Sequence, residues 1–476
     1  MSMNLGVDLL QTALPDAILA ASGLTGVLLG AIFGDRSSAL IRLLSVAALV
    51  VAAVFAFMQI AQPSHLAFEG LYLASPFTSF AKAVTYAMAA AALFMAGGFL
   101  RAVKMERYEY SLLTMFSAMG AGVMLSAHNL MTLYMGIETL SLSSYVLAAF
   151  NRDSVRSAEA GLKYFVLGAL ASGLLLYGSS LIYGFAHGTG YEAIAAAPIS
   201  VGLTFGLVFL IVGLAFKASA APFHVWVPDV YEGAPTPVVA YFSTAPKIAA
   251  VVVLANVMFT TFGPQSASWQ GVIAIISALS MVIGAFGALL QNNLKRILAY
   301  SSISNVGFAL IGIAAGEKIG AASVLVYMTL YVVATLGMFA GIMALRRGGL
   351  PLETVSDLNG LAKLKPGMAL GLIMLIFSVA GIPPLAGFWG KVQVIQAGLR
   401  ADMLWLVLIG LASSVVSLGY YLRVVWAIMM KPPAEKLDRT DWTVAATVFA
   451  SSVLMFPVLT IAIQRLLDVA ASAHVG

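Results

Sequence analysis

The sequence predicts an all-α polytopic membrane protein, and three observations point to this fold class. First, 61% of the residues are hydrophobic and only 9% are charged, whereas soluble domains have roughly 45–50% apolar and about 25% charged residues. Second, the apolar residues form runs long enough to cross a hydrocarbon core, which takes about 20 helical residues. Third, Lys and Arg gather in alternate loops between these runs, as they do on the cytoplasmic side of membrane proteins.

We expect about fourteen transmembrane helices, because the sequence contains that number of apolar runs of sufficient length. In chain order, the runs cover residues 14–34, 40–61, 76–100, 111–127, 129–150, 160–186, 201–221, 236–259, 270–290, 297–315, 319–345, 368–399, 403–429 and 443–467. The fourth and fifth runs meet at Ala127-His128-Asn129, a weak boundary that could lie inside one long kinked helix. Loss of one span there would invert the topology of every later span.

The positions of Lys and Arg support the full set of spans. If the N-terminus lies outside, the cytoplasmic loops contain Arg36, Arg42, Arg101, Lys104, Arg107, Arg152, Arg156, Lys163, Lys295, Arg296, Arg346, Arg347, Lys363, Lys365, Lys431, Lys436 and Arg439. The outer loops and ends contain only Lys318, Arg400 and Arg465. This bias is the positive-inside signal, so both termini are predicted outside. The formal net charge of +5 then follows from topology and does not indicate a nucleic-acid-binding protein.

Several kinds of function are excluded by what the sequence lacks. It contains no cysteine, which excludes thiolate-held iron–sulfur clusters, disulfides and CxxC redox chemistry. It also contains no GxxxxGK(S/T) loop for binding a nucleotide. The first residues, MSMNLGVDLLQTALPD, have neither a basic segment nor a small-residue cleavage site, so we expect no cleaved signal peptide.

Two of the runs are interrupted by proline. The seventh breaks within KASAAP, residues 217–222, and the twelfth breaks at Pro383-Pro384. A discontinuous, lysine-bearing helix thus recurs five spans later with the opposite direction, which is typical of inverted five-helix repeats. We therefore expect discontinuous helices 7 and 12 in two inverted repeats. The domains would be peripheral helices 1–3 in residues 1–110, a first repeat in 111–259, a second repeat in 260–430 and a final helix in 431–476.

Four ionisable residues lie deep within the runs, where charge is costly and therefore marks functional candidates. Glu138 is about halfway through the fifth run, and Lys217 and Lys247 are similarly deep. Burial disfavours the charged form of a lysine and a nearby carboxylate favours it, so a moving Glu–Lys pair would act as a proton switch. Lys391 lies about 13 Å of helical rise from the outer end of its run. It could be the last station before proton release or could simply snorkel to the surface, and Glu138 could instead be a structural helix contact.

The remaining ionisable residues are ambiguous. His224 follows the break in the seventh run and could relay protons between Lys217 and Lys247 or cap a broken helix. Lys163 could be a positive-inside anchor, and Glu159 beside it could be an inner proton entrance or the partner of that anchor. We expect loop anchors at Lys295 and Arg296, a solvated loop at Asp229 and Glu232, and snorkelling or pairing within the bundle at Lys82 and Arg423.

Three segments are similar to a known family. FHVWVPDVYEGAPTPVVAYFSTAPK (223–247), MGIETLSLSSYVL with Glu138, and GIPPLAGFWGK with Lys391 resemble the subunit N family of the bacterial proton-translocating NADH:quinone oxidoreductase, respiratory complex I. The resemblance covers essentially the whole chain. Subunits L and M and the Mrp-type cation/proton antiporters share the Glu, Lys and broken-helix plan. However, subunits L and M have different sequences where this chain has VYEGAPTPV and STAPK. Subunit M resembles this chain less at Lys391, where it has a glutamate. The long C-terminal lateral helix that marks subunit L is absent from this sequence.

The resemblance implies a role for each candidate. Glu138 and Lys217 would form an ion pair, His224 and Lys247 would continue a central polar axis, Lys391 would lead outward and Lys163 would lie near the input. It also implies a bacterial inner-membrane location, contacts with subunit M on one side and subunits K and J on the other, and no cofactor in this chain. FMN, iron–sulfur clusters and quinone would belong to other parts of the complex.

These expectations combine into one function and two rivals. The chain would be an antiporter-like subunit that moves protons outward through buried Glu, Lys and His residues, driven by redox chemistry in other subunits. The alternative is a stand-alone Mrp-type cation/proton antiporter subunit. A membrane scaffold with vestigial polar residues is the third reading.

Overall fold

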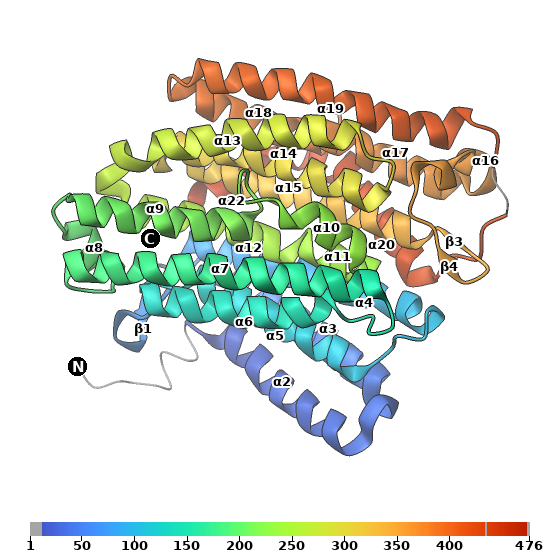
Figure 1. Ribbon diagram of the computed structural model, residues 1–476, viewed down its shortest axis with the longest axis horizontal. Helices are drawn as coiled ribbons and strands as arrows, with labels where there is room; N and C mark the ends of the chain where they lie inside the picture. The colour runs from blue at the N-terminus through green and yellow to red at the C-terminus, as the bar shows by residue number, and fades with distance from the viewer. Residues whose placement is uncertain (1–11, 434–435, 474–476) are drawn as a thin grey trace.

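The structure is a computed structural model that describes residues 12–433 and 436–473. Long helices lie side by side along the long axis of the molecule, with the N-terminal helices at one edge and α19 at the opposite edge (Figure 1). Within the described residues, ten helical stretches are long and apolar enough to cross a membrane, and α2 and α3 together make up one of them. The all-α membrane fold is therefore confirmed, whereas the number of fourteen spans stays a prediction. The predicted sides of the two termini concern residues outside these ranges.

Helices occur at every predicted run. The first half contains α2 (Leu14–Phe33), α3 (Ser38–Gln59), α4 (Pro76–Ala102), α5 (Tyr108–Leu125), α6 (Leu130–Ala148), α7 (Val155–Ala186), α8 (Tyr191–Ala196), α9 (Val201–Ala218), α10 (Trp226–Gly233), α11 (Thr236–Phe242) and α12 (Ala245–Thr260). The second half contains α13 (Ser266–Leu289), α14 (Leu294–Ala314), α15 (Glu317–Met343), α16 (Leu361–Leu364), α17 (Pro366–Ala380), α18 (Ala386–Arg400), α19 (Leu404–Met430), α20 (Trp442–Val453), α21 (Leu459–Ile461) and α22 (Ile463–Ser472).

Short elements connect the helices at the two ends of the bundle. The strands form two antiparallel hairpins, β1 (His65–Ala67) with β2 (Tyr72–Ala74), and β3 (Arg346–Arg347) with β4 (Leu350–Pro351). Single-turn helices are η1 (Gly34–Ser37), η2 (Phe68–Gly70), η3 (Gly263–Gln265) and η4 (Val355–Leu358), and η5 (Leu454–Val458) is a π-helical turn.

The weak boundary between the fourth and fifth runs separates two helices. α5 ends at Leu125, and the Asn129 side chain accepts a hydrogen bond of 2.8 Å from the Met131 amide at the start of α6. Asparagine is a preferred residue at this position because its side-chain oxygen satisfies an otherwise unpaired amide. The prediction of two separate helices is therefore confirmed.

Both predicted breaks are present, and two further breaks were missed. α9 ends at Ala218 and α17 ends at Ala380, and the next residues, Ser219 and Gly381, have left-handed backbone, with φ of 67° and 85°. The eighth run, predicted as one helix, is divided into α11 and α12 just before Pro246, because proline offers no amide to continue a helix. The fourteenth run is also interrupted, since Pro457 lies inside η5 and Phe456 has extended backbone.

Close helix pairs recur in the two halves. α5 packs against α6, and α13 packs against α14. A Cβ atom at Gly136 would clash with the backbone of Met124, and one at Gly284 would clash with the backbone of Ser304. Small residues let membrane helices approach closely, and the same device in equivalent pairs agrees with the inverted repeats. The predicted domain boundaries stay a prediction.

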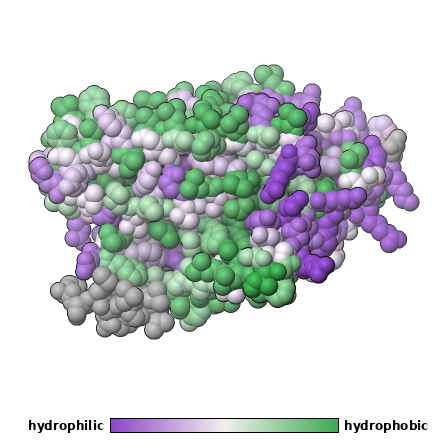
Figure 2. Space-filling model, turned by 60° about the horizontal axis from the view of Figure 1, so that its bottom comes forward, coloured by the Kyte–Doolittle hydropathy of each residue, from purple (hydrophilic) through white to green (hydrophobic). Residues whose placement is uncertain are grey.

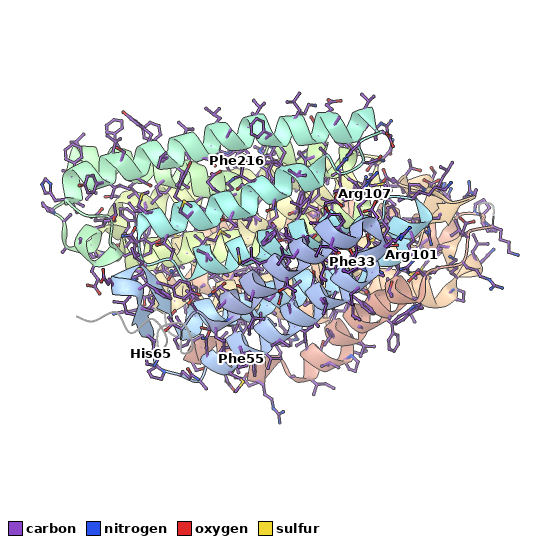
Figure 3. The ribbon with its side chains drawn as sticks, turned by 90° about the horizontal axis from the view of Figure 1, so that it is seen from below. Phe33, Phe55, His65, Arg101, Arg107 and Phe216 are labelled. Carbon is purple, nitrogen blue, oxygen red and sulfur yellow. The ribbon has the colours of Figure 1, made fainter. Side chains whose placement is uncertain are left out.

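The surface divides into an apolar body and a hydrophilic end. Figure 2 shows hydrophilic residues gathered at the end that holds β3 and β4 in Figure 1, and apolar residues over much of the rest of this face. Figure 3 shows Arg101 and Arg107 toward the same end and His65 toward the other. We call the end that holds Arg101, Arg107 and the β3–β4 hairpin the basic end. It collects loops that the sequence assigned to the cytoplasmic side.

Candidate functional site

Lys217 lies in the last turn of α9, directly before the break, and faces α6. Its Nζ donates a hydrogen bond of 2.6 Å to Ser141 Oγ and one of 3.4 Å to the Tyr145 hydroxyl. Ser141 and Tyr145 are three and seven positions after Glu138 in the same helix. Residues with this spacing share one helix face. The fold therefore brings Lys217 to the face of α6 that also carries Glu138.

The direct ion pair that the family resemblance implied is not present. Among the described residues, no ion pair joins Glu138 to Lys217, and Ser141, one turn later in α6, accepts the hydrogen bond from the lysine instead. One carboxylate oxygen of Glu138, Oε1, is buried and has no hydrogen-bond partner in the part of the chain that the structure describes. Ser141 and Tyr145, which the sequence analysis did not select, are thus the immediate neighbours of Lys217.

Lys247 lies in the first turn of α12, and only 2% of its surface is exposed. Its Nζ donates to Ser219 Oγ and lies 6.0 Å from the Trp226 ring and 5.8 Å from the Tyr231 ring. Ser219 is the left-handed residue directly after α9, two positions after Lys217. The segment at this break therefore makes two contacts. Lys217 contacts α6, and Ser219 contacts Lys247 of α12.

Lys217 and Lys247 also line one small cavity between α6, α9 and α12. Tyr164, Trp226 and Phe242 complete much of its wall, and it has room for about one water molecule. The Tyr164 and Trp226 rings stack with centroids 4.4 Å apart, which closes one side. Lys217 and Lys247 are thirty positions apart in the sequence. The fold brings both to this one cavity, beside Ser219.

His224 lies near the break in α9 but does not hydrogen bond directly to either lysine in the described part of the chain. It lies in the turn between α9 and α10, and no hydrogen bond joins it to Lys217 or Lys247 among the described residues, because Ser219 occupies the position beside Lys247. The His224 carbonyl instead accepts a hydrogen bond of 2.9 Å from the Val227 amide as α10 begins. This backbone contact does not involve the imidazole, whose Nδ1 is buried without a hydrogen-bond partner among the described residues. The relay and helix-cap interpretations of His224 therefore both stay predictions.

Lys391 occupies the counterpart position in the second half. It lies on α18, and its Nζ donates to the Ala380 carbonyl at 3.0 Å and to Ser414 Oγ at 3.4 Å. The cation also lies 4.8 Å from the centroid of the Phe308 ring. Ala380 is the last residue of α17, and the carbonyls at a helix end lack helical partners and carry partial negative charge. The broken helix therefore supplies the acceptor for the buried lysine.

A chain of uncharged polar groups approaches Lys391, and the sequence analysis missed it. The Tyr327 hydroxyl donates to Asn305 Oδ1 at 2.7 Å, and Asn305 Nδ2 donates to the Ser301 carbonyl at 2.7 Å. Asn305, Tyr327 and Lys391 line one small cavity. The available signal was a lone asparagine inside an apolar run, which is unusual for a membrane helix.

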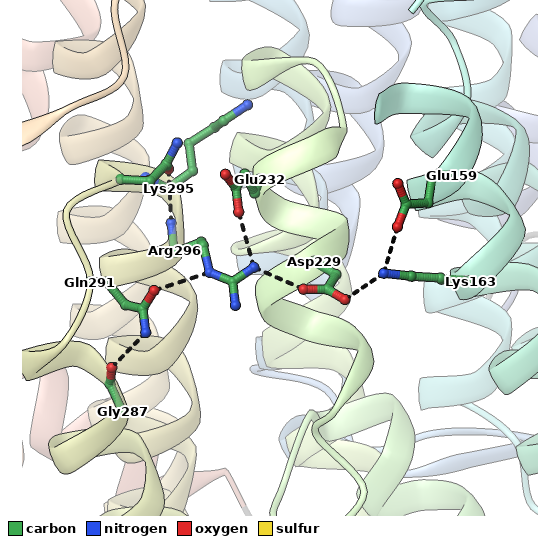
Figure 4. Close-up of polar contacts among 9 residues, drawn as sticks. Glu159, Lys163, Asp229, Glu232, Gly287, Gln291, Lys295 and Arg296 are labelled. Carbon is green, nitrogen blue, oxygen red and sulfur yellow. Dashed lines mark hydrogen bonds and ion pairs between the residues drawn. The ribbon is translucent and has the colours of Figure 1, made fainter. Parts of the chain in front are cut away.

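An ionic cluster near the basic end joins α7, α10 and α14 (Figure 4). Lys163 Nζ is 2.7 Å from both Glu159 and Asp229, and Arg296 Nη1 is 2.8 Å from Asp229 and 2.9 Å from Glu232. The predicted solvated loop at Asp229 and Glu232 is wrong, because both lie in helix α10 and are paired. Arg296 is likewise a partner in the first turn of α14 and not a loop anchor. Lys163 therefore links α7 to α10, with Glu159 of its own helix and Asp229 of α10 as its ion-pair partners.

Lys82 and Arg423 are paired within the bundle. Lys82, which is 1% exposed, lies 2.6 Å from Asp16 of α2, and the Tyr72 and Tyr86 hydroxyls also hydrogen bond to Asp16. Arg423 donates to the Leu289 carbonyl at 3.1 Å, at the end of α13. Pairing, the second of the two predicted alternatives, is confirmed, whereas the role of Asp16 was not predicted.

Comparison with known proteins decides the family. A family model described as "NADH:quinone oxidoreductase/Mrp antiporter, TM" matches residues 127–417, which is more than half of the chain. The chain belongs to the NADH:quinone oxidoreductase/Mrp antiporter family. This match spans α6 to the first half of α19, so it contains both predicted breaks together with Glu138, Lys217, Lys247 and Lys391. The Asp16–Lys82 pair lies outside it.

Individual relatives agree with the family. The NADH-quinone oxidoreductase subunit N of Hirschia baltica is 58% identical over 453 residues, which is 95% of each protein. A chain of respiratory complex I from Thermus thermophilus with bound aureothin is 31% identical with a TM-score of 0.84, over 96% of this chain and 100% of that chain. A chain of the Mrp complex from Dietzia sp. DQ12-45-1b has a TM-score of 0.86 at 23% identity over 97% of each chain, which shows a shared fold. The predicted resemblance to the subunit N family is confirmed.

In the described part of the chain, the buried charges are not accompanied by a cluster of metal-ligating side chains. Within residues 12–433 and 436–473, no three His, Asp or Glu side chains are close enough to hold a metal ion together. The chemistry that these side chains offer is the transfer of protons between lysines, hydroxyls and carboxylates.

Proposed function

We propose that the chain is a proton-translocating membrane subunit of a bacterial NADH:quinone oxidoreductase and has no redox site of its own. One observation carries this proposal. Each of the two predicted broken helices presents a lysine inside the bundle near its interruption, and in the first half Lys217 and Lys247 line one cavity, with Ser219 of the break accepting from Lys247. Buried ionisable groups beside broken helices mark ion pathways in transporters.

The contacts suggest an order of stations for the proton. It would pass from Lys217 through Ser219 and the shared cavity to Lys247, and then across the second half to Lys391. At each step a charged lysine gives its proton to a hydroxyl or water, and the next neutral lysine accepts one. Glu138 would act on Lys217 through Ser141, because negative charge on the same helix face favours the charged lysine.

Proton transport needs a source of energy outside this chain. Moving one charge against 100 mV costs about 2.3 kcal/mol, and the sequence has no nucleotide-binding loop. Redox chemistry that uses FMN, iron–sulfur clusters and quinone would occur in other subunits, as the complex I relatives suggest. We propose that subunit M on one side and subunits K and J on the other transmit this energy as a charge change near Glu138.

We also propose how the chain lies in the membrane. The basic end would face the cytoplasm of a bacterial inner membrane and both termini would lie outside, because Lys and Arg concentrate in the loops at that end. Residues 111–259 and 260–430 would form the two inverted repeats. The subunit would then take up protons at its basic end, on the cytoplasmic side, and release them on the outer side beyond Lys391.

Alanine at Lys217 or at Glu138 is expected to slow proton pumping by the assembled enzyme at least about tenfold, because a positioned acid–base group contributes that much or more. The measurement is quinone reduction and proton pumping in inverted membrane vesicles. Wild-type pumping in both variants would contradict the proposal. Loss of assembly alone would favour a scaffold. Sodium–proton exchange by the purified chain in liposomes would favour the Mrp-type alternative, which the Dietzia Mrp fold keeps relevant.

A further inference from the structure

A cavity of about 510 Å³ opens at the basic end, away from the Lys217–Lys247 cavity. Its floor is the junction between α10 and α11, formed by Ala234, Pro235 and Thr236. The end of α4, the α6–α7 connection and the β3–β4 hairpin supply its walls. We call this space the α10–α11 cavity. It opens at a further interruption of the helical backbone, the junction between α10 and α11.

A buried ion pair lies at the floor of the α10–α11 cavity. Lys295 is 3% exposed, and its Nζ lies 2.7 Å from Glu353 Oε1 and 3.1 Å from the Ala234 carbonyl. Thr236 Oγ1 donates to the same Glu353 oxygen at 3.3 Å. The Glu353 side chain is 22% exposed. This carboxylate therefore contacts both the open cavity and the first residue of α11.

The wall formed by the β3–β4 hairpin is held in place. The Asp438 carboxylate accepts hydrogen bonds from the Gly349 amide at 2.8 Å and the Gly348 amide at 3.1 Å. The hydrogen bond from Gly349, with that from Gly348 and the nearby basic side chains, lowers the pKa of Asp438 below its ordinary value. The carboxylate is thus charged at neutral pH and keeps the tip of the hairpin beside the cavity.

The elements at the floor lead directly to Lys247. Tyr231 of α10 lies three positions before Ala234, and its buried ring is 5.8 Å from Lys247 Nζ. α11 runs from Thr236 to Phe242, about 10 Å of helical rise, and Lys247 lies just beyond the break, in the first turn of α12. The Ser243 and Thr244 hydroxyls lie at the break between α11 and α12 on this path. One end of this helical segment therefore faces the cavity, and the other end holds the central lysine.

We propose that the α10–α11 cavity is a proton-uptake site and that Glu353 is the group that first accepts the proton. The Glu353 carboxylate takes a proton from hydronium in the cavity, which leaves water and a neutral carboxylic acid. The acid then releases that proton toward the neutral amine of Lys247, which becomes an ammonium, and Glu353 returns to a carboxylate. This inference rests on the proposed function, and it gives Lys247 a supply of protons that bypasses Lys217.

The other charged groups around the cavity fit this role. Lys104 and Arg156 line it and are basic, while the second carboxylate, Glu232, is already paired with Arg296. Lys295 also donates to the Ala234 carbonyl, so its position does not depend on Glu353 alone. Of the two carboxylates that line the cavity, Glu232 is thus paired with a guanidinium and Glu353 with the ammonium of Lys295. A purely structural clamp between α14 and α11 is the competing explanation.

The absence of cysteine from the chain allows a matched test. Glu353→Cys is made in the intact enzyme in membrane vesicles and treated with 2-carboxyethyl or 2-sulfonatoethyl methanethiosulfonate. Both reagents add a negative group on the same linker, but only the carboxylate can carry a proton near neutral pH. Untreated Glu353→Cys is expected to pump at least about tenfold more slowly. The carboxyethyl adduct should restore pumping, and the sulfonatoethyl adduct should not.

Two outcomes would overturn this inference. Equal rescue by both adducts would mean that Glu353 serves only as a fixed negative partner of Lys295, and wild-type pumping by untreated Glu353→Cys would mean that it is not needed. Asp35→Cys, at an exposed aspartate of the same end that does not line the cavity, and the treated wild-type enzyme are the controls. Normal pumping by a parallel Lys247→Met variant would instead contradict the proposed function itself. Loss in Lys247→Met without loss in Glu353→Cys would remove only the role of the cavity.

Discussion

Replacing Lys247 with methionine is expected to reduce proton pumping by about 100-fold or more, within the range that a positioned acid–base group contributes. Lys247 is 2% exposed and contacts Ser219, so it stands between the Lys217 segment and the second half. Methionine keeps much of the volume but removes the proton-carrying amine. The measurement is proton uptake by vesicles during quinone reduction, with NADH oxidation by a soluble artificial acceptor reporting that the enzyme is assembled.

Lys247→Arg separates proton transfer from charge. Arginine stays protonated in proteins, so it can replace the positive charge but cannot release the proton. We therefore expect Lys247→Arg to pump as poorly as Lys247→Met. Lys318→Met, at an exposed lysine of the opposite end, should leave pumping unchanged. Normal pumping by Lys247→Arg would show that the site needs only a cation and would contradict its role as a relay.

Replacing Lys82 with methionine is expected to destabilise the N-terminal helices by about 3–5 kcal/mol, because it leaves Asp16 buried without its cation. Asp16 and Lys82 are 7% and 1% exposed, and the pair joins α2 to α4. The Tyr72 hydroxyl of β2 hydrogen bonds to the same carboxylate. The measurement is the thermal stability of the purified enzyme, together with the amount of this subunit that remains assembled.

The double variant Asp16→Leu/Lys82→Met distinguishes the ion pair from simple loss of packing. Removing both charges together avoids an uncompensated buried carboxylate, so most of the lost stability should return. Arg107→Ala breaks a pair with Asp35 that is 3.7 Å long and about half exposed on both sides, and it should cost less than about 1 kcal/mol. A double variant no more stable than Lys82→Met would show that the charges do not account for the effect.

Much of the fold could be predicted because its signals are local. A run of apolar residues specifies a membrane helix wherever it occurs, and Pro222 and Pro383-Pro384 interrupt helices through their own geometry. The missed division between α11 and α12 had the same kind of signal in Pro246, but the surrounding apolar run concealed it. The buried lysines were also visible, since each stands out against an apolar background.

The partners of those charges could not be predicted in the same way. Ser141 is 76 positions from Lys217, and Asp16 is 66 positions from Lys82. A serine or an N-terminal aspartate gives no sign in the sequence of which distant helix it will face. The family resemblance suggested Glu138 as the direct partner of Lys217, and the fold put Ser141 of the same helix there instead.

The sequence by itself determined that this is a helical membrane protein with broken helices, one strongly basic set of loops and lysines inside its spans. Hydropathy, proline geometry and the cost of buried charge act on each segment separately, so they can be read along the chain. Only the tertiary structure decided that Ser219 contacts Lys247 and that Asp229 and Glu232 lie in a helix and pair with Arg296. It also decided that Glu353 faces the α10–α11 cavity. Hydrogen bonds and ion pairs act over a few ångströms, so their partners are fixed only when distant helices pack together.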